Sequence, residues 1–107
     1  MVYEILKTEV FDKKFGRLDH SIQSRLKKIR ERIKDDPYIG RPLDFEFFRE
    51  VKIGKFRFYY LIYEHYKVIY MITLSEKKDQ QIAISTIKLF LEKYKQDIED
   101  WIKRNKN

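Results

Sequence analysis

Basic side chains concentrate in two stretches of the sequence, close to aromatic residues. The first stretch, REVKIGKFRFYYLIY, spans residues 49–63, and the second, TLSEKKD, spans residues 73–79. Cations interleaved with aromatic rings on a sheet suit a nucleic acid, because cations contact phosphates while rings stack on bases. The candidate contacts are Arg49, Lys52, Lys55, Arg57, Lys77 and Lys78, with the rings of Tyr59 and Tyr70.

The first stretch is predicted to form a β-hairpin that turns at Gly54. Gly at the first central position of a two-residue loop is typical of a type II′ turn. That register places Val51 opposite Phe58 and Lys52 opposite Arg57. Two like charges facing each other across a ladder cost about 0.2–1 kcal/mol. The pair becomes favourable when a phosphate or a carboxylate lies between the two groups, and binding sites commonly tolerate such local conflict.

The basic residues also have structural explanations. Edge strands are often kept basic to prevent aggregation, which explains Lys52 and Lys55. It explains Arg57 poorly, because Arg57 begins a strand expected at the centre of the sheet. A third basic stretch flanks the apolar stripe of a predicted helix, either as a solvated helix face or as a contact for RNA phosphates. Its cations are Arg25, Lys27, Lys28, Arg30, Arg32 and Lys34.

Length and composition predict one domain over residues 1–107 with one core. The chain is 43% hydrophobic and carries a net charge of +7, which suits a polyanionic partner such as nucleic acid, an anionic membrane surface or an acidic protein. No apolar run approaches the ~18 residues that span a bilayer, and the charged first 20 residues do not resemble a signal peptide. We therefore expect a cytoplasmic protein with no membrane association.

Few residue types remain for catalysis. The chain has no Cys, and its two histidines, His20 and His65, lie far apart in sequence. No His/Asp/Glu cluster has metal-ligand spacing, and no Gly-rich phosphate loop is present. The sequence therefore predicts no metal and no cofactor, so that any catalysis would depend on Arg, Lys, Tyr or His.

Hydrophobic periodicity predicts the element order strand, helix, helix, three strands, helix. A short strand opens the chain within residues 1–10. Apolar residues then recur every three or four positions from Phe11 to Ile33, with a break before Asp19, which with Ser21 is a candidate N-cap of the second helix. Three strands follow, at about 46–53, 56–63 and 66–74.

From Gln81 onward the helical period returns and is predicted to form one long amphipathic helix. Its stripe either packs on the sheet or offers a heptad-like seam to a partner helix. The expected fold class is α+β: a small, mostly antiparallel four-stranded sheet with two N-terminal helices and a long C-terminal helix. We expect the helices to cover one face and to leave the other partly open as the working surface. The stripe residues are Ile84, Ile87, Leu91, Tyr94, Ile98 and Trp101.

The hairpin and the basic pair that follows it resemble the RelE/ParE toxin superfamily. That family has a basic strand, a glycine turn, an aromatic–Arg pair, an apolar strand ending in Tyr, and a basic residue after the last strand. The element order is similar to the family's fold across nearly the whole chain. The motif is short and degenerate, and it is the combination of motif and element order that carries the resemblance.

The resemblance implies a toxin of a type II toxin–antitoxin system. RelE-like members are metal-independent ribonucleases that cleave mRNA in the ribosomal A site, and related members inhibit DNA gyrase without cleaving anything. Both kinds are held inactive by an antitoxin, here expected to be acidic. In the ribonucleases Arg57 would bind the scissile phosphate, with Lys52 and Lys77 beside it. The ribose 2′-OH would attack that phosphate, and the cations would stabilise the charge of the transition state.

One family feature differs in this chain. Active relatives often carry a Tyr, acting as general base, about one turn past the last basic residue, where this chain reads Gln80, Gln81, Ile82 and Ala83. The general base is therefore unassigned, with Tyr59 or Tyr70 as substitutes. Three hypotheses stay open: a ribosome-dependent endoribonuclease, a gyrase inhibitor of the same fold, and a basic RNA-binding module without toxicity.

Overall fold

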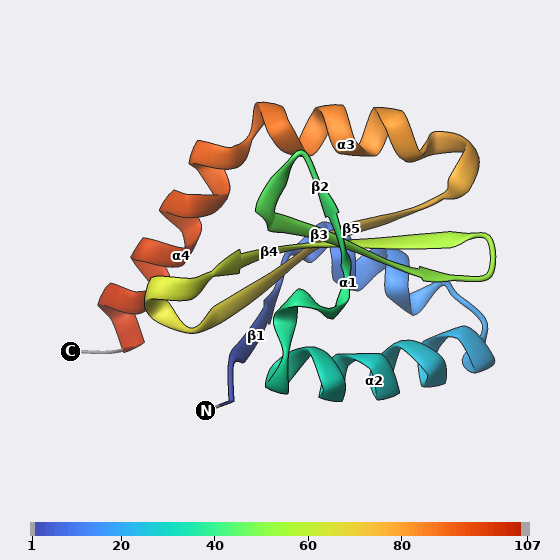
Figure 1. Cartoon of the computed structure of the whole chain (residues 1–107), viewed down its shortest axis with the longest axis horizontal. Helices are drawn as coiled ribbons and strands as arrows, with labels where there is room; N and C mark the ends of the chain where they lie inside the picture. Colours follow the sequence, from blue (N-terminus) through green and yellow to red (C-terminus); the bar gives the residue numbers. More distant parts are fainter. Residues whose placement is uncertain (1, 106–107) are drawn as a thin grey trace.

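The computed structural model describes residues 2–105, so that Met1 and residues 106–107 of the expected domain lie outside the described part. A central sheet separates two pairs of helices, α1 and α2 on one face and α3 and α4 on the other (Figure 1). The helices and strands are β1 (Glu4–Lys7), α1 (Glu9–Gly16), α2 (His20–Asp35), β2 (Arg41–Leu43), β3 (Phe45–Ile53), β4 (Phe56–Tyr63), β5 (Val68–Glu76), α3 (Gln80–Leu89) and α4 (Leu91–Asn105).

The sheet has five strands in the order β1-β5-β4-β3-β2, one more than predicted. The additional strand is β2, a three-residue edge strand paired with β3. The three strands predicted from the alternation pattern are confirmed as β3, β4 and β5, which run antiparallel to one another. The first strand, β1, joins the last strand in parallel, with Glu4 beside Val68.

The predicted hairpin register is confirmed. Val51 pairs with Phe58, and Lys52 pairs with Arg57. Gly54 has φ +57°, a left-handed conformation that glycine adopts without steric cost. The side chains of β3 and β4 therefore alternate between the two faces as the sequence predicts, with Lys52 and Arg57 on the α3 side.

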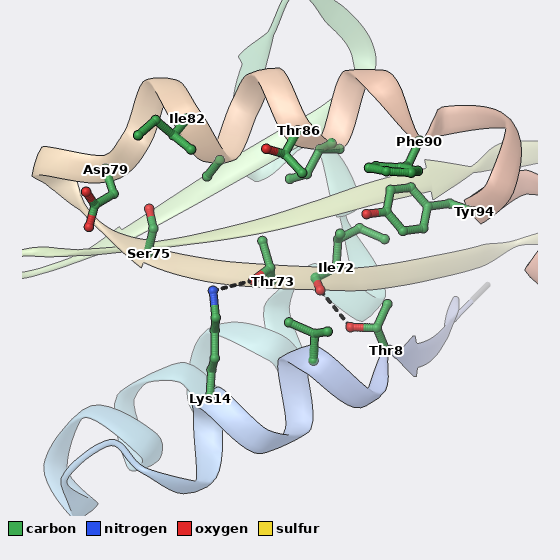
Figure 2. Close-up of a pocket in the computed structure, with 13 residues that line it drawn as sticks. Thr8, Lys14, Ile72, Thr73, Ser75, Asp79, Ile82, Thr86, Phe90 and Tyr94 are labelled. Atoms are coloured by element: carbon green, nitrogen blue, oxygen red, sulfur yellow. Dashed lines mark hydrogen bonds between the residues drawn. The ribbon is translucent and has the colours of Figure 1, made fainter.

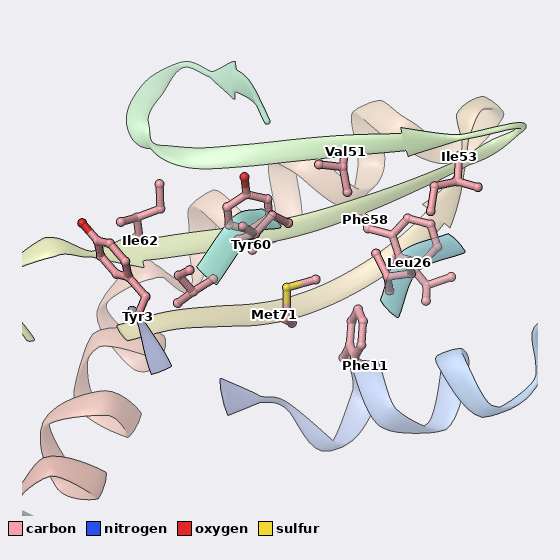
Figure 3. Packing of buried hydrophobic residues seen from close by; sticks show 12 residues of the cluster. Tyr3, Phe11, Leu26, Val51, Ile53, Phe58, Tyr60, Ile62 and Met71 are labelled. Carbon is pink, nitrogen blue, oxygen red and sulfur yellow. The ribbon is translucent and has the colours of Figure 1, made fainter. Parts of the chain in front are cut away.

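The helices α1 and α2 pack on one face because their apolar stripes meet the inward side chains of the hairpin. Phe11 of α1 and Leu26 of α2 lie against Phe58 and Met71 in a cluster that excludes solvent (Figure 3). Asp19 is the N-cap of α2, since its carboxylate accepts a hydrogen bond from the backbone N–H of Ile22 at 3.1 Å. The break that the sequence predicts between the two helices is thus confirmed.

The opposite face is also covered, which corrects the expectation of an open working surface. Ile87 of α3 and Ile98 of α4 are each 1% exposed and pack on Phe48 and Leu61. β4 is covered on both faces, which explains why its side chains are apolar on both sides of the sheet. The C-terminal stripe therefore packs on the sheet, as the first of the two alternatives predicts.

The long C-terminal helix is divided in two at Phe90, where the sequence predicts one helix. A straight helix over residues 80–105 would be roughly 39 Å long at 1.5 Å per residue. That length matches the longest dimension of the whole molecule, 40 Å. The bend lets α3 and α4 keep their buried residues on the sheet instead of extending past it (Figure 1).

Candidate functional site: a basic cleft beside the hairpin

A cleft of about 580 Å³ opens where β2 ends and leaves the outer edge of β3 without a neighbouring strand. β2 pairs with β3 only as far as Glu50, so residues 51–53 form the edge of the sheet there. The helix α2 closes the cleft on one side and the start of α3 closes it on the other. The residues that line it are Ile29, Arg32, Ile39, Gly40, Arg41, Glu50, Val51, Lys52, Arg57, Lys77 and Gln80.

The cleft brings together the three residues predicted as catalytic. Lys52 and Arg57 come from the two strands of the hairpin, and Lys77 comes from the 3₁₀ turn Lys77–Asp79 that follows β5. The backbone N–H of Lys77 donates to the carbonyl of Lys55 at 2.8 Å, which ties that turn to the tip of the hairpin. Residues more than 20 positions apart thus meet because the hairpin turn and the end of β5 are hydrogen-bonded to each other.

Arg57 is the most rigidly held cation of the three. Its side chain is only 6% exposed, and its Nη1 donates to the carbonyls of Gly54 and Phe56, each at 3.1 Å. Both bonds start from one nitrogen, so they fix the guanidinium plane relative to the hairpin turn. A guanidinium held in this way presents its remaining donors in a fixed direction, which suits recognition of a phosphate.

None of these three cations forms an ion pair within residues 2–105. Lysines elsewhere on the surface do, for example Lys55 with Glu76 at 3.8 Å and Lys88 with Asp44 at 2.7 Å. Unpaired cations in a shared cleft repel one another and lower stability. An anion placed between them would remove that repulsion, so the arrangement is that of an anion site.

Lys55 and Lys78 lie outside the group of residues that line the cleft. Lys55 sits in the hairpin turn, where its Nζ lies 5.5 Å from the ring centroid of Phe56. Lys78 is exposed in the turn after β5. Both remain candidates for contact with a longer polyanion that extends beyond the cleft.

Arg49, predicted as an RNA contact, has a structural position that does not favour this role. It is 5% exposed, and its guanidinium donates to the carbonyl of Gly40 at 2.9 Å and to the carbonyl of Glu46 at 2.8 Å. It also lies over the ring of Tyr38 at 5.0 Å. These contacts hold the segment before β2 against β3. They also occupy the guanidinium of Arg49, which is therefore poorly placed to bind a phosphate.

Tyr59 and Tyr70 lie on the same face as Lys52 and Arg57, but their burial does not favour the predicted stacking on bases. They are 0% and 9% exposed beneath α3 and α4. Tyr59 is hydrogen-bonded to Ser75 at 2.8 Å, and Tyr70 donates to Asp97 at 3.1 Å.

Neither tyrosine suits the role of general base. Burial raises the pKa of Tyr59 above its ordinary value of 10.0, although the hydrogen bond with Ser75 opposes the shift. Burial and then the nearby carboxylate of Asp97 raise the pKa of Tyr70 further. Both phenols therefore stay protonated at neutral pH.

Four charged or amide-bearing residues of the cleft were not among the predicted catalytic and RNA-binding residues. Arg41 and Glu50 were not singled out, Arg32 was named only as part of the basic helix, and Gln80 was named only as standing where the family's Tyr is expected. The alternation of β3 could have identified Glu50, because it lies two positions before Lys52 and so shares its face. Arg41 could not have been found in this way, because β2 is too short to show a pattern.

A second hollow, of about 530 Å³, lies across the sheet at the free edge of β5 (Figure 2). It runs between α1 and α3, and Figure 2 shows Ile82 and Phe90 along one wall with Lys14 reaching up from α1. Lys14 donates to Thr73 Oγ1 and to the carbonyl of Leu74, each at 3.2 Å, so its charge is already used to cover the strand edge. This groove is mainly apolar, and we therefore place the polyanion site in the basic cleft.

Neither a metal-binding cluster nor a membrane-spanning helix is found within residues 2–105. No group of three or more His, Cys, Asp or Glu side chains lies close enough together to bind a metal ion there. None of the helices in this part of the chain combines the length and the apolar character needed to cross a membrane.

Comparison with known proteins gives a clear result only at the level of structure. No protein-family model matches the chain, and no curated protein sequence matches it significantly. A mutant of the Escherichia coli toxin RelE in the free state has a similar structure, with a TM-score of 0.69 and 17% identity over 80% of this chain and 93% of that one.

Two archaeal complexes also match. RelE–RelB from Pyrococcus horikoshii gives a TM-score of 0.64 with 18% identity over 71% of this chain and 96% of that one. RelB–RelE from Methanococcus jannaschii gives 0.58 with 13% identity over 73% and 96%. At such low identity these similarities establish the architecture alone, and they confirm what the hairpin motif implied: this chain has the fold of the RelE toxins.

Proposed function

We propose that this protein is the toxin of a type II toxin–antitoxin pair and that it cleaves mRNA on the ribosome. The observation that supports this proposal best is the meeting of Lys52, Arg57 and Lys77 in one cleft without a carboxylate partner among the described residues. A scissile phosphate between these cations would relieve their repulsion. The RelE fold gives the arrangement its context, since the similar structures are toxins and toxin–antitoxin complexes.

The proposed reaction is transesterification within the RNA strand. The ribose 2′-oxygen attacks the adjacent phosphorus, the bond from phosphorus to the 5′-oxygen breaks, and a 2′,3′-cyclic phosphate remains. The transition state carries more negative charge on the phosphoryl oxygens than the substrate does. Arg57, Lys52 and Lys77 would stabilise that extra charge, an effect worth roughly 100-fold or more in rate for one well-placed donor.

The proposed partner is an acidic antitoxin expressed with the toxin in the cytoplasm. The net charge of +7 and the unpaired cations of the cleft favour a partner that places a carboxylate near Arg57. Because helices cover both faces of the sheet, such a partner would reach the cleft from the β3 edge and would not lie across the sheet. Electrostatic attraction of this kind predicts that association slows as salt rises.

A translation extract with a defined mRNA tests the proposal. Purified protein should produce discrete cuts in the translated mRNA, mapped by primer extension, and the cuts should persist in EDTA. Arg57→Ala is the matched control and should leave the mRNA intact. If the protein instead traps DNA-cleavage complexes of gyrase and leaves the mRNA whole, the gyrase-inhibitor hypothesis would replace this one. RNA binding without cutting or growth arrest would favour the module without toxicity.

A further inference from the structure

Glu50 is an acidic residue in a cleft that otherwise carries cations, and it is the single acid among the residues that line it within the described part of the chain. It is 4% exposed and lies two positions before Lys52 on the same face of β3. Across the hairpin Glu50 pairs with Tyr59, which is the next residue after Arg57 on the same face of β4. A carboxylate in this position would repel a bound phosphate, so a role in phosphate binding does not explain why Glu50 is there.

The carboxylate of Glu50 is held from two sides. Gln80, the first residue of α3, donates its side-chain amide to Oε1 at 2.6 Å. Arg41 of β2 lies 3.9 Å from Oε2, which is an ion pair without a short hydrogen bond. Oε1 is thus fixed by Gln80, whereas Oε2 keeps acceptor capacity toward the cleft.

Within residues 2–105, no tyrosine, histidine or second carboxylate lines the cleft. Tyr59 and Tyr70 are buried and protonated, as described above. His20 begins α2 and His65 lies in the 3₁₀ turn Glu64–Tyr66, and neither of them lines the cleft. Among the residues that line it, Glu50 is the one side chain with a carboxylate.

We propose that Glu50 is the general base of the reaction and that Gln80 positions it, an inference that rests on the proposed function. The carboxylate takes the proton of the ribose 2′-OH as the 2′-oxygen forms its bond to phosphorus. The bond from phosphorus to the 5′-oxygen breaks, and that oxygen takes a proton from the ammonium group of Lys52 or Lys77. Proton removal by a positioned base contributes about 10²–10⁴-fold to a rate.

The competing explanation is that Glu50 only offsets the charge of the cleft. The two explanations differ in how Glu50→Gln divides its effect between KM and kcat. Removal of a negative charge from a cationic cleft favours RNA binding under either explanation, so KM should stay the same or fall. Only loss of a base lowers kcat at the same time.

The experiment measures mRNA cleavage on purified, programmed ribosomes by wild type, Glu50→Gln and Glu76→Gln. Glu76 is a control at the half-exposed end of β5, where it pairs with Lys55. We expect Glu50→Gln to lower kcat by ~100-fold or more without raising KM, and Glu76→Gln to behave as wild type. Gln80→Ala should also lower kcat, by a smaller factor, because Glu50 loses its fixed orientation.

Wild-type kcat in Glu50→Gln, or a rise in KM alone, would overturn the base assignment and leave the proposed function standing. Failure of the wild type to cut any mRNA would overturn both. Thermal melting checks that each variant is folded. If Glu50→Gln does not fold, Glu50→Asp replaces it: a carboxylate drawn back by one methylene should lower kcat with little change in KM, and an unchanged kcat would again reject the assignment.

Discussion

Lys52 and Arg57 stand directly opposite each other across the β3–β4 hairpin, and neither has a carboxylate partner within residues 2–105. The hairpin therefore keeps a repulsive pair at a position where a neutral pair would be more stable. Arg57 is nearly buried and Lys52 is exposed, and both line the cleft. An anion that enters the cleft would therefore be attracted by both cations. The first prediction below depends on this arrangement.

Arg57→Ala should abolish activity without unfolding the protein. The mutation removes two hydrogen bonds from a charged donor to hairpin carbonyls, worth about 1.5–3 kcal/mol each, and it also removes the repulsion from Lys52, so that the protein should be less stable but still folded. Activity should fall ~100-fold or more. Growth inhibition on expression, measured together with thermal melting, checks both parts. Arg57→Lys keeps the charge but loses the planar fork, and it should recover only part of the activity.

Lys77→Ala should reduce mRNA cleavage far more than Lys78→Ala does. The two lysines are neighbours in sequence and both are exposed, but only Lys77 lines the cleft. A loss of ~10-fold or more is expected for Lys77→Ala, because one of three charges near the phosphate disappears. Equal losses for the two variants would show that the cations act through general attraction for RNA and not through the cleft.

Arg49→Ala should destabilise the fold although it lies just before the hairpin motif. Its guanidinium donates to two backbone carbonyls, of Gly40 and Glu46, from a position that is 5% exposed. Hydrogen bonds from charged groups are worth about 1.5–3 kcal/mol each, so the free energy of unfolding should fall by about 3 kcal/mol. Urea denaturation measures the loss. Arg25→Ala, on the exposed face of α2, is the matched control and should change stability little.

Glu64 should make the protein sensitive to strong acid. Hydrogen bonds from Lys67 first, then from Tyr3 and Tyr38, lower the pKa of Glu64 from 4.5 to about 2. A lowered folded-state pKa contributes stability that is fully present above the unfolded value and is lost as pH falls through the folded value. We therefore expect stability to drop between pH 4.5 and 2.

Urea denaturation at pH 2.5, 4.5 and 7 measures this dependence. In Glu64→Gln the amide cannot titrate, so the part of the acid-induced loss that belongs to Glu64 should disappear. A variant that keeps the full wild-type slope would show that other carboxylates govern the acid limb. Glu9→Gln, on the exposed side of α1, serves as the control substitution.

Local features of the fold could be predicted because short-range chemistry determines them. The register of the hairpin follows from Gly54 and from the alternation of Val51 and Phe58, and the start of α2 follows from Asp19. β4 carries apolar residues on both faces, which is typical of a strand that is covered on both sides. The working surface was nevertheless expected on an open face, because the sequence does not show that α3 and α4 return to it.

The candidate site was predictable in part. Lys52, Arg57 and Lys77 could be identified, since a hairpin register and one turn bring them together. Burial is the property that the sequence does not show: nothing local distinguishes Arg49, held by backbone carbonyls, from an arginine free to contact RNA. Such distinctions depend on which distant segments pack above a strand, and they need the tertiary structure.

The parallel pairing of β1 with β5 has a consequence for how this protein is made. Thr8, which directly follows β1, donates its hydroxyl to the carbonyl of Ile72, 64 residues further along the chain. Contacts of such long sequence separation slow folding, because a large loop must close before they form. The sheet cannot be completed until β5 has been synthesised, and Lys77 and Gln80 of the cleft come later still. During translation, the cleft of a nascent chain should thus not form until about three quarters of that chain has left the ribosome.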